Sequence, residues 1–506
     1  MDRIDEESQQ PAPPVTFTGR KTLVAAAVAV VLIAGALLIR PARTGDDARP
    51  PGPSERAASA VGRGAPVAAV DLTALVAGRE KWVAAHPRDH ASWAVLGAAY
   101  LEQGRRTADS GWFPKAEKAL KRSLEARPAE KGNFDAMTGM GTLANARRDF
   151  GTGKKWGELL RAQAPERWTA YPVLVDAYTG LGDYKAAQAA MDRLLELQTG
   201  LVAYTKASQV YRDRGWREDA VMAMEHAAGA AKAPAEKAHA LFRLGELSFE
   251  RGDAALALTQ YEAALRTDPG QAQALGGRAR ALAGLGRGGE AVRDYRMALG
   301  RTPVPQLALE LGELLEALGR GQEARVPYDM LGALAARDGS NGVDDDVVLG
   351  LYEADHGDPA AAVRRLSQEW SRHKSVQVAD ALGWALHKSG DDVAALEYAK
   401  KATEQGLRSA DFAYHRAMIE RGLGDESAAR RHLEEALRTN PRFSPLRAPR
   451  AKEMLTVIGQ PAAGGPENVL PTKPWVAPEL PKPNPPKPKP PAVPPAAKPT
   501  PTPASD

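Results

Sequence analysis

The sequence contains no cysteine among its 506 residues. Disulfide bonds, thiolate metal sites, cysteine-dependent catalysis and lipid attachment through a thiol are therefore excluded. The absence is compatible with an oxidising compartment.

Charge of one sign is not concentrated in the central part of the chain. The formal net charge is +4 and the isoelectric point is about 9.0, but lysines near the C-terminus contribute to both values. Elsewhere acidic and basic side chains are interspersed, whereas nucleic-acid-binding domains carry a basic stripe or patch. We therefore expect no nucleic-acid partner.

Motifs that carry chemistry are also missing. The nine histidines are scattered, and the sequence contains no HExxH and no nucleophile elbow. The segment from Gly284 to Gly289 fits GxGxxG, but it follows an expected helix, whereas a dinucleotide site requires a preceding strand. The acidic segment 338–346 lacks the placed glycine and the closing glutamate of a calcium loop, and we expect a solvated connector. No catalytic residue, cofactor, metal or small-molecule substrate is expected.

The sequence does contain an internal repeat. Two segments, AHALFRLGELSFERGDAALALTQYEAALRTDP and AQALGGRARALAGLGRGGEAVRDYRMALGRTP, superpose with a shift of 34 residues. The matching pairs are Ala238 and Ala272, Leu241 and Leu275, Ala257 and Ala291, Tyr261 and Tyr295, Ala264 and Ala298, and Pro269 and Pro303. A fixed period of this size indicates stacked supersecondary units.

Each repeat predicts a pair of helices. Three leucines between Leu241 and Leu247 recur at helical spacing and give the first helix one apolar face. Gly245 is small where two helices must approach each other closely. Gly252 breaks the chain before a second helix, and Pro269 prevents that helix from continuing. One hairpin of this kind cannot bury its apolar face alone, so successive hairpins must stack.

This pattern resembles the tetratricopeptide repeat. The resemblance rests on the 34-residue period, the small residue eight positions into the unit, the aromatic residue of the second helix and the closing proline. It implies an all-α fold, a right-handed solenoid in which the first helix of each unit lines a concave groove. It says little about function, because such arrays hold very different partners.

The repeats extend over most of the chain, and we expect a solenoid over residues 70–460. A helix capped by Asp71 is expected to cover one end, and a helix from Phe443 to Ile458 the other. The first unit carries an inserted segment between its helices, and the second is degenerate. Ten units are expected, beginning near His90, Phe134, Trp168, Leu201, Ala238, Ala272, Pro305, Val343, Val376 and Ala410.

An apolar segment precedes the repeats. Residues 22–39 carry no charge and, as a helix, would reach about 27 Å, close to the ~30 Å thickness of a hydrocarbon core. We expect a transmembrane helix there, after a disordered tail over 1–21 and before a flexible linker over 40–69. A cleaved signal peptide is disfavoured, because the leader is acidic and no Ala-x-Ala site follows closely.

The orientation of this anchor is not decided by charge, because basic residues flank it on both sides. A short tail, one anchor and a large domain favour an extracytoplasmic repeat domain. Residues 461–506 are rich in proline and lysine and are expected to form a disordered, polyproline-like tail. A ligand for another domain, a spacer and a solubilising tail remain alternatives for it.

The family resemblance also implies groove positions. Mixed charges and aromatic side chains on one concave wall suit an extended peptide or a partner helix, and Trp384 and Tyr414 are the expected hot spots. The Asn and Lys pairs that clamp a terminal carboxylate in some relatives are not recognisable. The partner-binding residues implied are Asn145, Asp176, Gln209, Arg212, Phe242, Glu246, Arg280, Glu313, Asp380, Trp384, His387, Tyr414 and Arg421.

Together these features favour a membrane-anchored, non-catalytic scaffold of a bacterial envelope that binds protein or peptide partners. One alternative is a cytoplasmic-facing regulator or assembly factor with the same fold. A second alternative is an enzyme whose catalytic groups converge in the groove or in the inserted loops.

Overall fold

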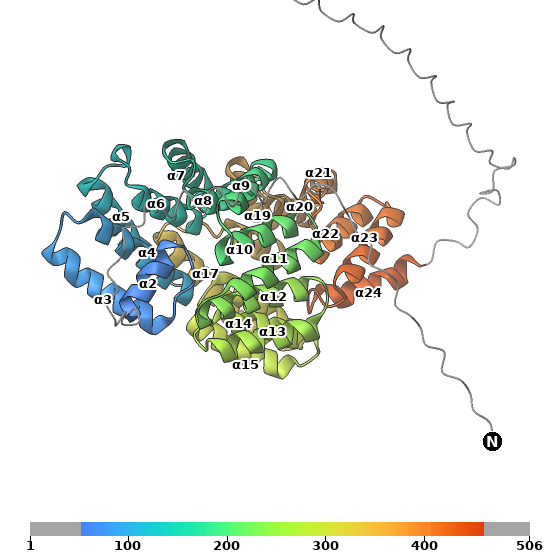
Figure 1. Cartoon of the computed structure of the whole chain (residues 1–506). Coiled ribbons are helices and arrows are strands. Elements are labelled where there is room, and N and C mark those ends of the chain that lie inside the picture. Colours follow the sequence, from blue (N-terminus) through green and yellow to red (C-terminus); the bar gives the residue numbers. More distant parts are fainter. Residues whose placement is uncertain (1–51, 404, 460–506) are drawn as a thin grey trace, which may run out of the picture.

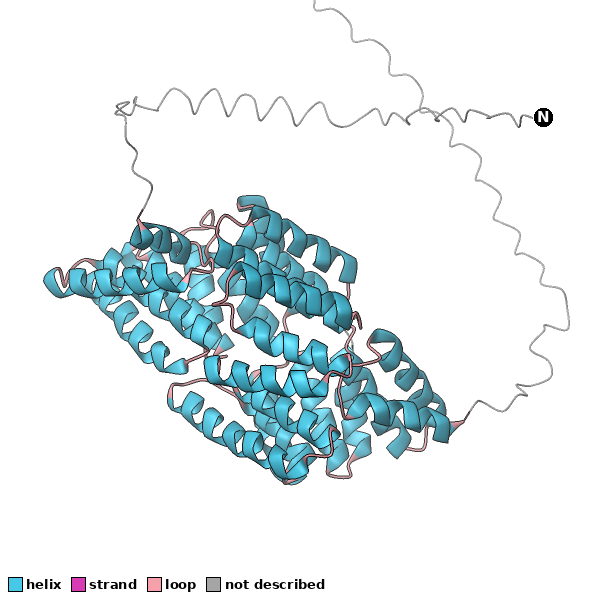
Figure 2. Ribbon diagram, turned by 90° about the horizontal axis from the view of Figure 1, so that it is seen from below, coloured by secondary structure: helices cyan, strands magenta, loops and turns pink. Residues whose placement is uncertain are grey.

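The computed structural model describes residues 52–459 except residue 404. This part of the chain folds into 23 α-helices and two short 3-10 helices, with no strand (Figures 1 and 2). The all-α fold predicted from the sequence is confirmed for these residues.

The helices pair into ten units, and each unit begins within four residues of the start that the sequence predicts. The first unit also contains the 3-10 helix η1 (Ser110–Trp112), and η2 (Ala129–Lys131) follows it. The pairs are α4 (His90–Thr107) and α5 (Phe113–Ala126), α6 (Phe134–Ala146) and α7 (Phe150–Gln163), α8 (Ala170–Leu181) and α9 (Tyr184–Leu197), α10 (Leu201–Asp213) and α11 (Arg217–Ala230), α12 (Pro234–Glu250) and α13 (Ala254–Thr267), α14 (Gln273–Gly284) and α15 (Gly288–Arg301), α16 (Pro305–Ala317) and α17 (Gly321–Ser340), α18 (Asp346–His356) and α19 (Pro359–Arg372), α20 (Val376–Lys388) and α21 (Asp392–Thr403), and α22 (Ala410–Gly422) and α23 (Glu426–Thr439).

A Gly-Asp pair makes the turn inside several units. Gly252 has φ +86°, a left-handed conformation that favours glycine and ends α12. The side chain of Asp253 then accepts a 2.9 Å hydrogen bond from the backbone N–H of Leu256 and caps α13. Gly182 and Asp183 make the same turn between α8 and α9. Two adjacent residues therefore fix the hairpin geometry locally.

Small residues let the paired helices pack closely. A Cβ atom at Gly245 would lie 2.5 Å from the ring of Tyr261, which is fully buried. A Cβ atom at Gly277 of the next unit would overlap the same ring. Tyr261 therefore fills the space that glycines leave in its own unit and the next, as the sequence predicts for Gly245.

The repeats wind into a superhelix whose successive turns touch. The backbone N–H of Val376 donates a 2.9 Å hydrogen bond to the hydroxyl of Tyr184, and Asn440 donates one of 2.8 Å to the carbonyl of Phe249. The first contact joins the third unit to the start of the ninth, and the second joins the fifth unit to the end of the tenth. Figure 1 shows the consequence, since α20 to α24 lie beside the earlier helices α9 to α12.

The acidic segment 338–346 takes part in this contact between turns, and the expectation of a solvated connector is wrong. Helix α17 continues to Ser340, and the buried carboxylate of Asp338 accepts a 2.6 Å hydrogen bond from Ser110 in the inserted loop of the first unit. Arg147 donates to the carbonyl of Asn341 over 2.9 Å. Asp338 and Asp345 are buried between the two superhelical turns, whereas Gly339, Ser340 and Gly342 are exposed, so solvent reaches only part of the segment.

The N-terminal cover differs from the prediction. Residues 53–62, which the sequence analysis assigned to a flexible linker, form α2 (Pro53–Gly62), with Ala57 and Val61 buried against α3 (Ala69–Ala85) and α12. The cap of α3 is Ala68, and Asp71 instead pairs with Arg56 at 2.9 Å. An alanine-rich face was sufficient to bury this segment. At the other end, α24 (Arg447–Ile458) forms the expected final helix.

No helix among the described residues is long and apolar enough to cross a membrane. The segments expected to form the first tail (1–21) and the transmembrane helix (22–39) lie outside the described residues, as do residues 40–51 of the linker and the tail over 461–506.

Candidate functional site

A cavity of about 590 Å³ lies between two superhelical turns. One wall comes from α12, α14 and α16, which belong to the fifth, sixth and seventh units. The other wall comes from α22, α24 and the segment that joins α23 to α24. The lining side chains include Phe249, Glu250, Arg280, Tyr295, Gln306, Glu310, Glu313, Leu314, Asp411, Arg442, Phe443, Arg447 and Lys452.

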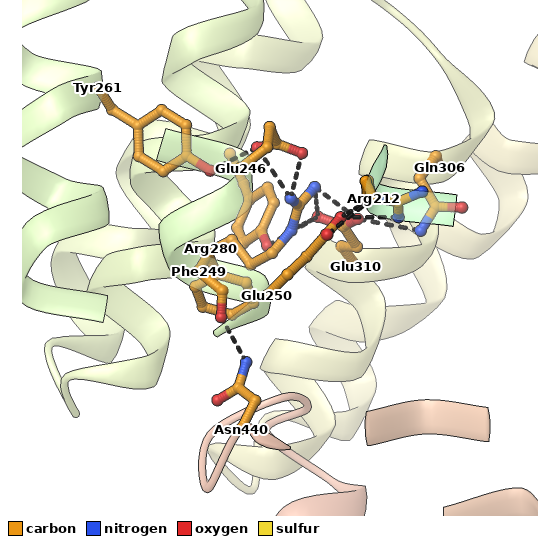
Figure 3. Close-up of polar contacts among 10 residues, drawn as sticks. Arg212, Glu246, Phe249, Glu250, Tyr261, Arg280, Gln306, Glu310 and Asn440 are labelled. Atoms are coloured by element: carbon orange, nitrogen blue, oxygen red, sulfur yellow. Dashed lines mark hydrogen bonds and ion pairs between the residues drawn. The ribbon is translucent and has the colours of Figure 1, made fainter. Parts of the chain in front are cut away.

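The first wall is organised around Arg280. Its guanidinium pairs with Glu246 of α12 at 3.1 Å and with Glu310 of α16 at 3.0 Å (Figure 3). Tyr261 donates its hydroxyl to Glu246, and Tyr295 donates to Glu310 over 2.9 Å. Burial lowers the pKa of Arg280, but Glu310 and Glu246 outweigh burial and hold that pKa well above its usual value. The arginine is therefore charged and fixed.

The repeat itself places this ladder. Tyr261 and Tyr295 occupy equivalent positions of successive second helices, and Glu246 and Arg280 occupy equivalent positions of successive first helices. Tyr261 thus orients the carboxylate of Glu246, and Tyr295 orients that of Glu310. Arg212 and Glu250 make a further pair on the same wall at 2.7 Å.

The second wall is organised around Arg447, in the first turn of α24. Its guanidinium contacts Glu313 of α16 at 2.9 Å, Asp355 of α18 at 3.1 Å and Asp411 of α22 at 3.3 Å. Asp355 has a second cation, Lys388, at 3.3 Å. Carboxylates from three units therefore converge on one arginine and fix the final helix to the inner surface.

Glu313 is the most perturbed acid of this group. Its side chain is 10% exposed, and burial raises the pKa of its carboxyl to about 7, against the lowering effect of Arg447. The neighbouring carboxylates of Asp355, Asp411 and Glu310 raise it further. Burial also raises the pKa of Asp411. The cavity floor is therefore short of positive charge.

The groove residues predicted from the sequence divide into those at this cavity and those away from it. Arg280 and Glu313 line the cavity, and Glu246 and Arg212 contact lining residues. Asn145 instead donates to the carbonyl of Val173, and Asp176 pairs with Lys206. The half-buried Gln209 and Phe242 and the exposed Arg421 are not among the lining residues.

Four of the predicted positions are buried and not exposed as expected: Glu313, Asp380, Trp384 and Tyr414. Trp384 stacks on His415 with ring centroids 4.3 Å apart, and His415 in turn pairs with Asp380 at 2.9 Å. Trp384 and Tyr414 share a hydrophobic cluster with Phe443 and α24, so the final helix covers them. They cannot act as exposed hot spots in this conformation. His387, predicted with them, pairs with Asp392 at 2.5 Å.

Three residues at the cavity were not predicted from the sequence: Arg447, Glu310 and Lys452. Arg447 lies in the segment expected only to cover the end of the solenoid, and its partner Glu313 is 134 residues away in sequence. No local pattern indicates such a contact. Glu310 could have been found, because it lies on the same first helix as the predicted Glu313, one turn earlier.

Two motifs weighed in the sequence have other roles. The GxGxxG segment joins α14 to α15, two helices, and its glycines border the cavity. In the acidic segment 338–346, which was considered as a calcium loop, the carboxylates of Asp344 and Asp346 lie close to that of Glu369. Arg372 pairs with all three carboxylates at 2.6 to 2.9 Å. An arginine therefore balances the charge that a cation would balance.

Comparisons with known proteins identify the repeats. Models of the tetratricopeptide repeat match residues 170–199, 205–272 and 277–338. The predicted resemblance is confirmed over these residues, so the central part of the chain is an array of tetratricopeptide repeats. Repeats of this kind form concave binding surfaces. No curated protein matches the chain.

Solved structures are similar at low identity. The Rap protein complexed with competence and sporulation factor is 13% identical, with a TM-score of 0.41 over 64% of this chain and 99% of that one. The APC/C hetero-tetramer Cut9-Hcn1 is 16% identical, with a TM-score of 0.36 over 73% and 76%. A tetratricopeptide repeat protein from Parabacteroides merdae is 18% identical, with a TM-score of 0.31 over 51% and 98%.

Proposed function

We propose that this protein is a non-catalytic scaffold that binds a segment of a protein or peptide partner in the cavity between α12–α16 and α22–α24. The observation that carries the proposal is the cavity of about 590 Å³, walled by charged and aromatic side chains from two superhelical turns. Ligand sites commonly occupy about 300–1,000 Å³ and combine apolar walls with a few fixed polar groups.

The size of the cavity favours an extended segment. A helix about 10 Å wide would fill this volume over about 8 Å of its length, or roughly five residues. An extended peptide needs less width per residue. Because ion pairs already hold Arg280 and Arg447 in place, binding need not order them, which lowers its entropic cost.

A binding role fits the lining groups better than catalysis. The guanidinium groups of Arg280 and Arg447 are held by carboxylates. The one lining hydroxyl from serine, Ser444, accepts a 3.1 Å hydrogen bond from the backbone N–H of Arg447 at the start of α24. A nucleophile would instead need a neighbouring general base. The one lining group that favours the enzyme alternative is Glu313, because its pKa is raised to about 7. Arg447 already pairs with this carboxylate at 2.9 Å.

The partner can be tested by photo-crosslinking in cells. The full chain would carry p-benzoylphenylalanine in place of Lys452, which is exposed at the cavity mouth, or in place of Val393, which is 73% exposed on α21. We expect a discrete partner adduct from the Lys452 position and none of the same mass from Val393. The same adduct at both positions, or none at Lys452, would contradict the proposal.

We also propose that residues 22–39 anchor the chain in a membrane and that the repeats face away from the cytoplasm. The uncharged 18-residue length of this segment supports the anchor. A reporter fused after Asp506, together with protease access in intact cells, tests the orientation. Protection of the repeats from external protease would favour the cytoplasmic-facing alternative.

A further inference from the structure

The floor of the cavity has more carboxylates than cations. Glu313 and Asp411 line it and share one cation, Arg447. Arg447 also contacts Asp355, which has Lys388 as a second cation. Arg280, at the other wall, is already shared between Glu246 and Glu310. Neither arginine can therefore neutralise a further carboxylate without breaking an ion pair that it already makes.

Two carboxylate oxygens of the floor have no partner. Arg447 contacts Oε1 of Glu313 and Oδ1 of Asp411. The second oxygen of each group makes no hydrogen bond to any described residue, although both residues line the cavity. Glu313 is more than nine-tenths buried. Both oxygens are therefore open to a donor that a ligand brings into the cavity.

The walls of the cavity suit a long aliphatic side chain. Phe249, Tyr295 and Phe443 border it, together with Leu314 and Leu318. Lysine and arginine bury their methylene groups against such surfaces while their charged ends reach polar groups. The aromatic rings also add a favourable interaction with a cation.

We infer that the partner inserts one basic side chain, lysine or arginine, into this cavity and that the carboxylates of Glu313 and Asp411 accept it. This inference rests on the proposed function and specifies its ligand. The bound cation supplies the charge and the hydrogen-bond donors that the floor lacks. It also favours the ionised form of Glu313, whose pKa burial and the neighbouring carboxylates together raise to about 7 against the effect of Arg447.

The mouth of the cavity adds a second element of specificity. Arg442 and Lys452 are exposed there and make no ion pair within the described part of the chain. A second positive charge beside the inserted residue would meet them and be repelled. The preferred segment is thus a single basic residue with neutral or acidic neighbours and not a polybasic run.

Fluorescence anisotropy on the full chain tests this directly. The probes are labelled, acetylated nonapeptides of alanine, proline and leucine with one central lysine, arginine, norleucine or glutamate. The lysine and arginine probes should bind at least about tenfold more tightly than the norleucine probe. Norleucine has no charged group, so its complex lacks the buried charged hydrogen bond. Glutamate should bind most weakly. Equal binding of the lysine and norleucine probes, or no binding of any probe at millimolar concentration, would overturn the inference.

Variants of the floor assign the acceptors. Glu313→Gln combined with Asp411→Asn should reduce lysine-probe binding to the norleucine level, whereas Glu323→Gln, on an exposed pair with Arg320, should leave it unchanged. Asp411→Asn alone is the variant least able to disturb folding, because this side chain is 41% exposed, and it should also weaken the lysine probe. Persistence of the lysine preference in the double variant would contradict the assignment.

The chain's own tail is a competing source of lysine. Replacing its lysines with serine should leave probe binding unchanged, whereas tighter binding would assign the cavity to the tail and overturn the assignment to a partner. If the partner crosslinked at position 452 binds equally well to the Glu313→Gln, Asp411→Asn variant, this inference is contradicted. The proposed function would still hold, because the partner would still occupy the cavity. The lysines concerned are Lys473, Lys482, Lys487, Lys489 and Lys498.

Discussion

The backbone N–H of Val376 donates a 2.9 Å hydrogen bond to the hydroxyl of Tyr184, which precedes it by 192 residues. Both residues are buried, and the bond joins the third unit to the start of the ninth. It is one of a series of contacts that close two superhelical turns on each other and enclose the candidate site.

Removing the hydroxyl of Tyr184 should destabilise the fold. Tyr184→Phe leaves the buried N–H of Val376 without its acceptor, and such a loss costs about 1–3 kcal/mol. Urea denaturation followed by circular dichroism measures the change. Tyr398→Phe is the matched control, because its hydroxyl makes no hydrogen bond to a described residue, and its effect should be close to zero. Equal effects of the two substitutions would contradict the closure.

A pair of glycines separates backbone strain from contact between turns. Gly182 has φ +80° and Gly286 has φ +77°, so alanine adds similar strain of about 1–2 kcal/mol at either position. A Cβ atom at Gly182 would also overlap the carbonyl oxygen of Lys374, whereas nothing lies within 4 Å of one at Gly286.

Gly182→Ala should therefore lower the free energy of unfolding more than Gly286→Ala does. The expected difference between the two variants is about 1–3 kcal/mol, the usual cost of overpacking. It should also enlarge the hydrodynamic radius, because the turns must separate to admit the methyl group. Sedimentation velocity measures the second effect. An unchanged radius together with equal destabilisation would show that the turns do not pack as described.

The sequence predicted the repeated helix pairs but not the contacts between superhelical turns. Leucine spacing, the Gly252–Asp253 turn and the closing prolines act within one unit, so the positions of the ten units followed from the sequence. The contact between Tyr184 and Val376 depends on the sum of small rotations between successive units over six units. The sequence of a single unit does not reveal this sum.

The same limit explains the mixed result at the site. Arg280 and Glu313 were found because they occupy groove positions of their units. The burial of Trp384 and Tyr414 could not be found, since it depends on where α24 returns to the inner surface. At the N-terminal end, proline and glycine suggested a linker, while the helical spacing of Ala57, Ala60 and Val61 was the signal for α2.

Arg447 should be the main attachment of the final helix. Arg447→Ala leaves the buried Glu313 without its cation, and breaking a buried pair in this way costs about 3–5 kcal/mol. Amide hydrogen exchange over α24 should accelerate strongly. Arg450→Ala, on the same helix but exposed and without an ion pair within the described residues, should change little. Adding Glu313→Gln to Arg447→Ala should restore part of the loss, and no restoration would argue against this pairing.

Glu313 should make the stability of the fold depend on pH. Its pKa is about 7 in the folded state, against 4.5 as the ordinary value. The folded protein therefore holds a proton that the unfolded chain releases between these pH values, and its stabilising effect is lost as pH rises through 7. The groups that face Glu313 are Arg447, Asp355, Asp411 and Glu310.

The loss is at most about 3.5 kcal/mol, since one pKa unit corresponds to about 1.4 kcal/mol. The measurement is the free energy of unfolding of the full chain and of Glu313→Gln from pH 5 to pH 8. The variant should lack the part of the decline that falls between about pH 5 and pH 7. Parallel curves for the two proteins would exclude a raised pKa at this position.

The central claim is that one partner segment contacts two superhelical turns at once. Amide hydrogen exchange of the full chain, alone and with the partner identified by crosslinking, measures this directly. The account predicts protection in α16 around Glu310–Leu314 and also in the segment from Pro441 to Lys452, which line the same cavity. Protection confined to one of these segments, or to the outer helices of the units, would contradict it.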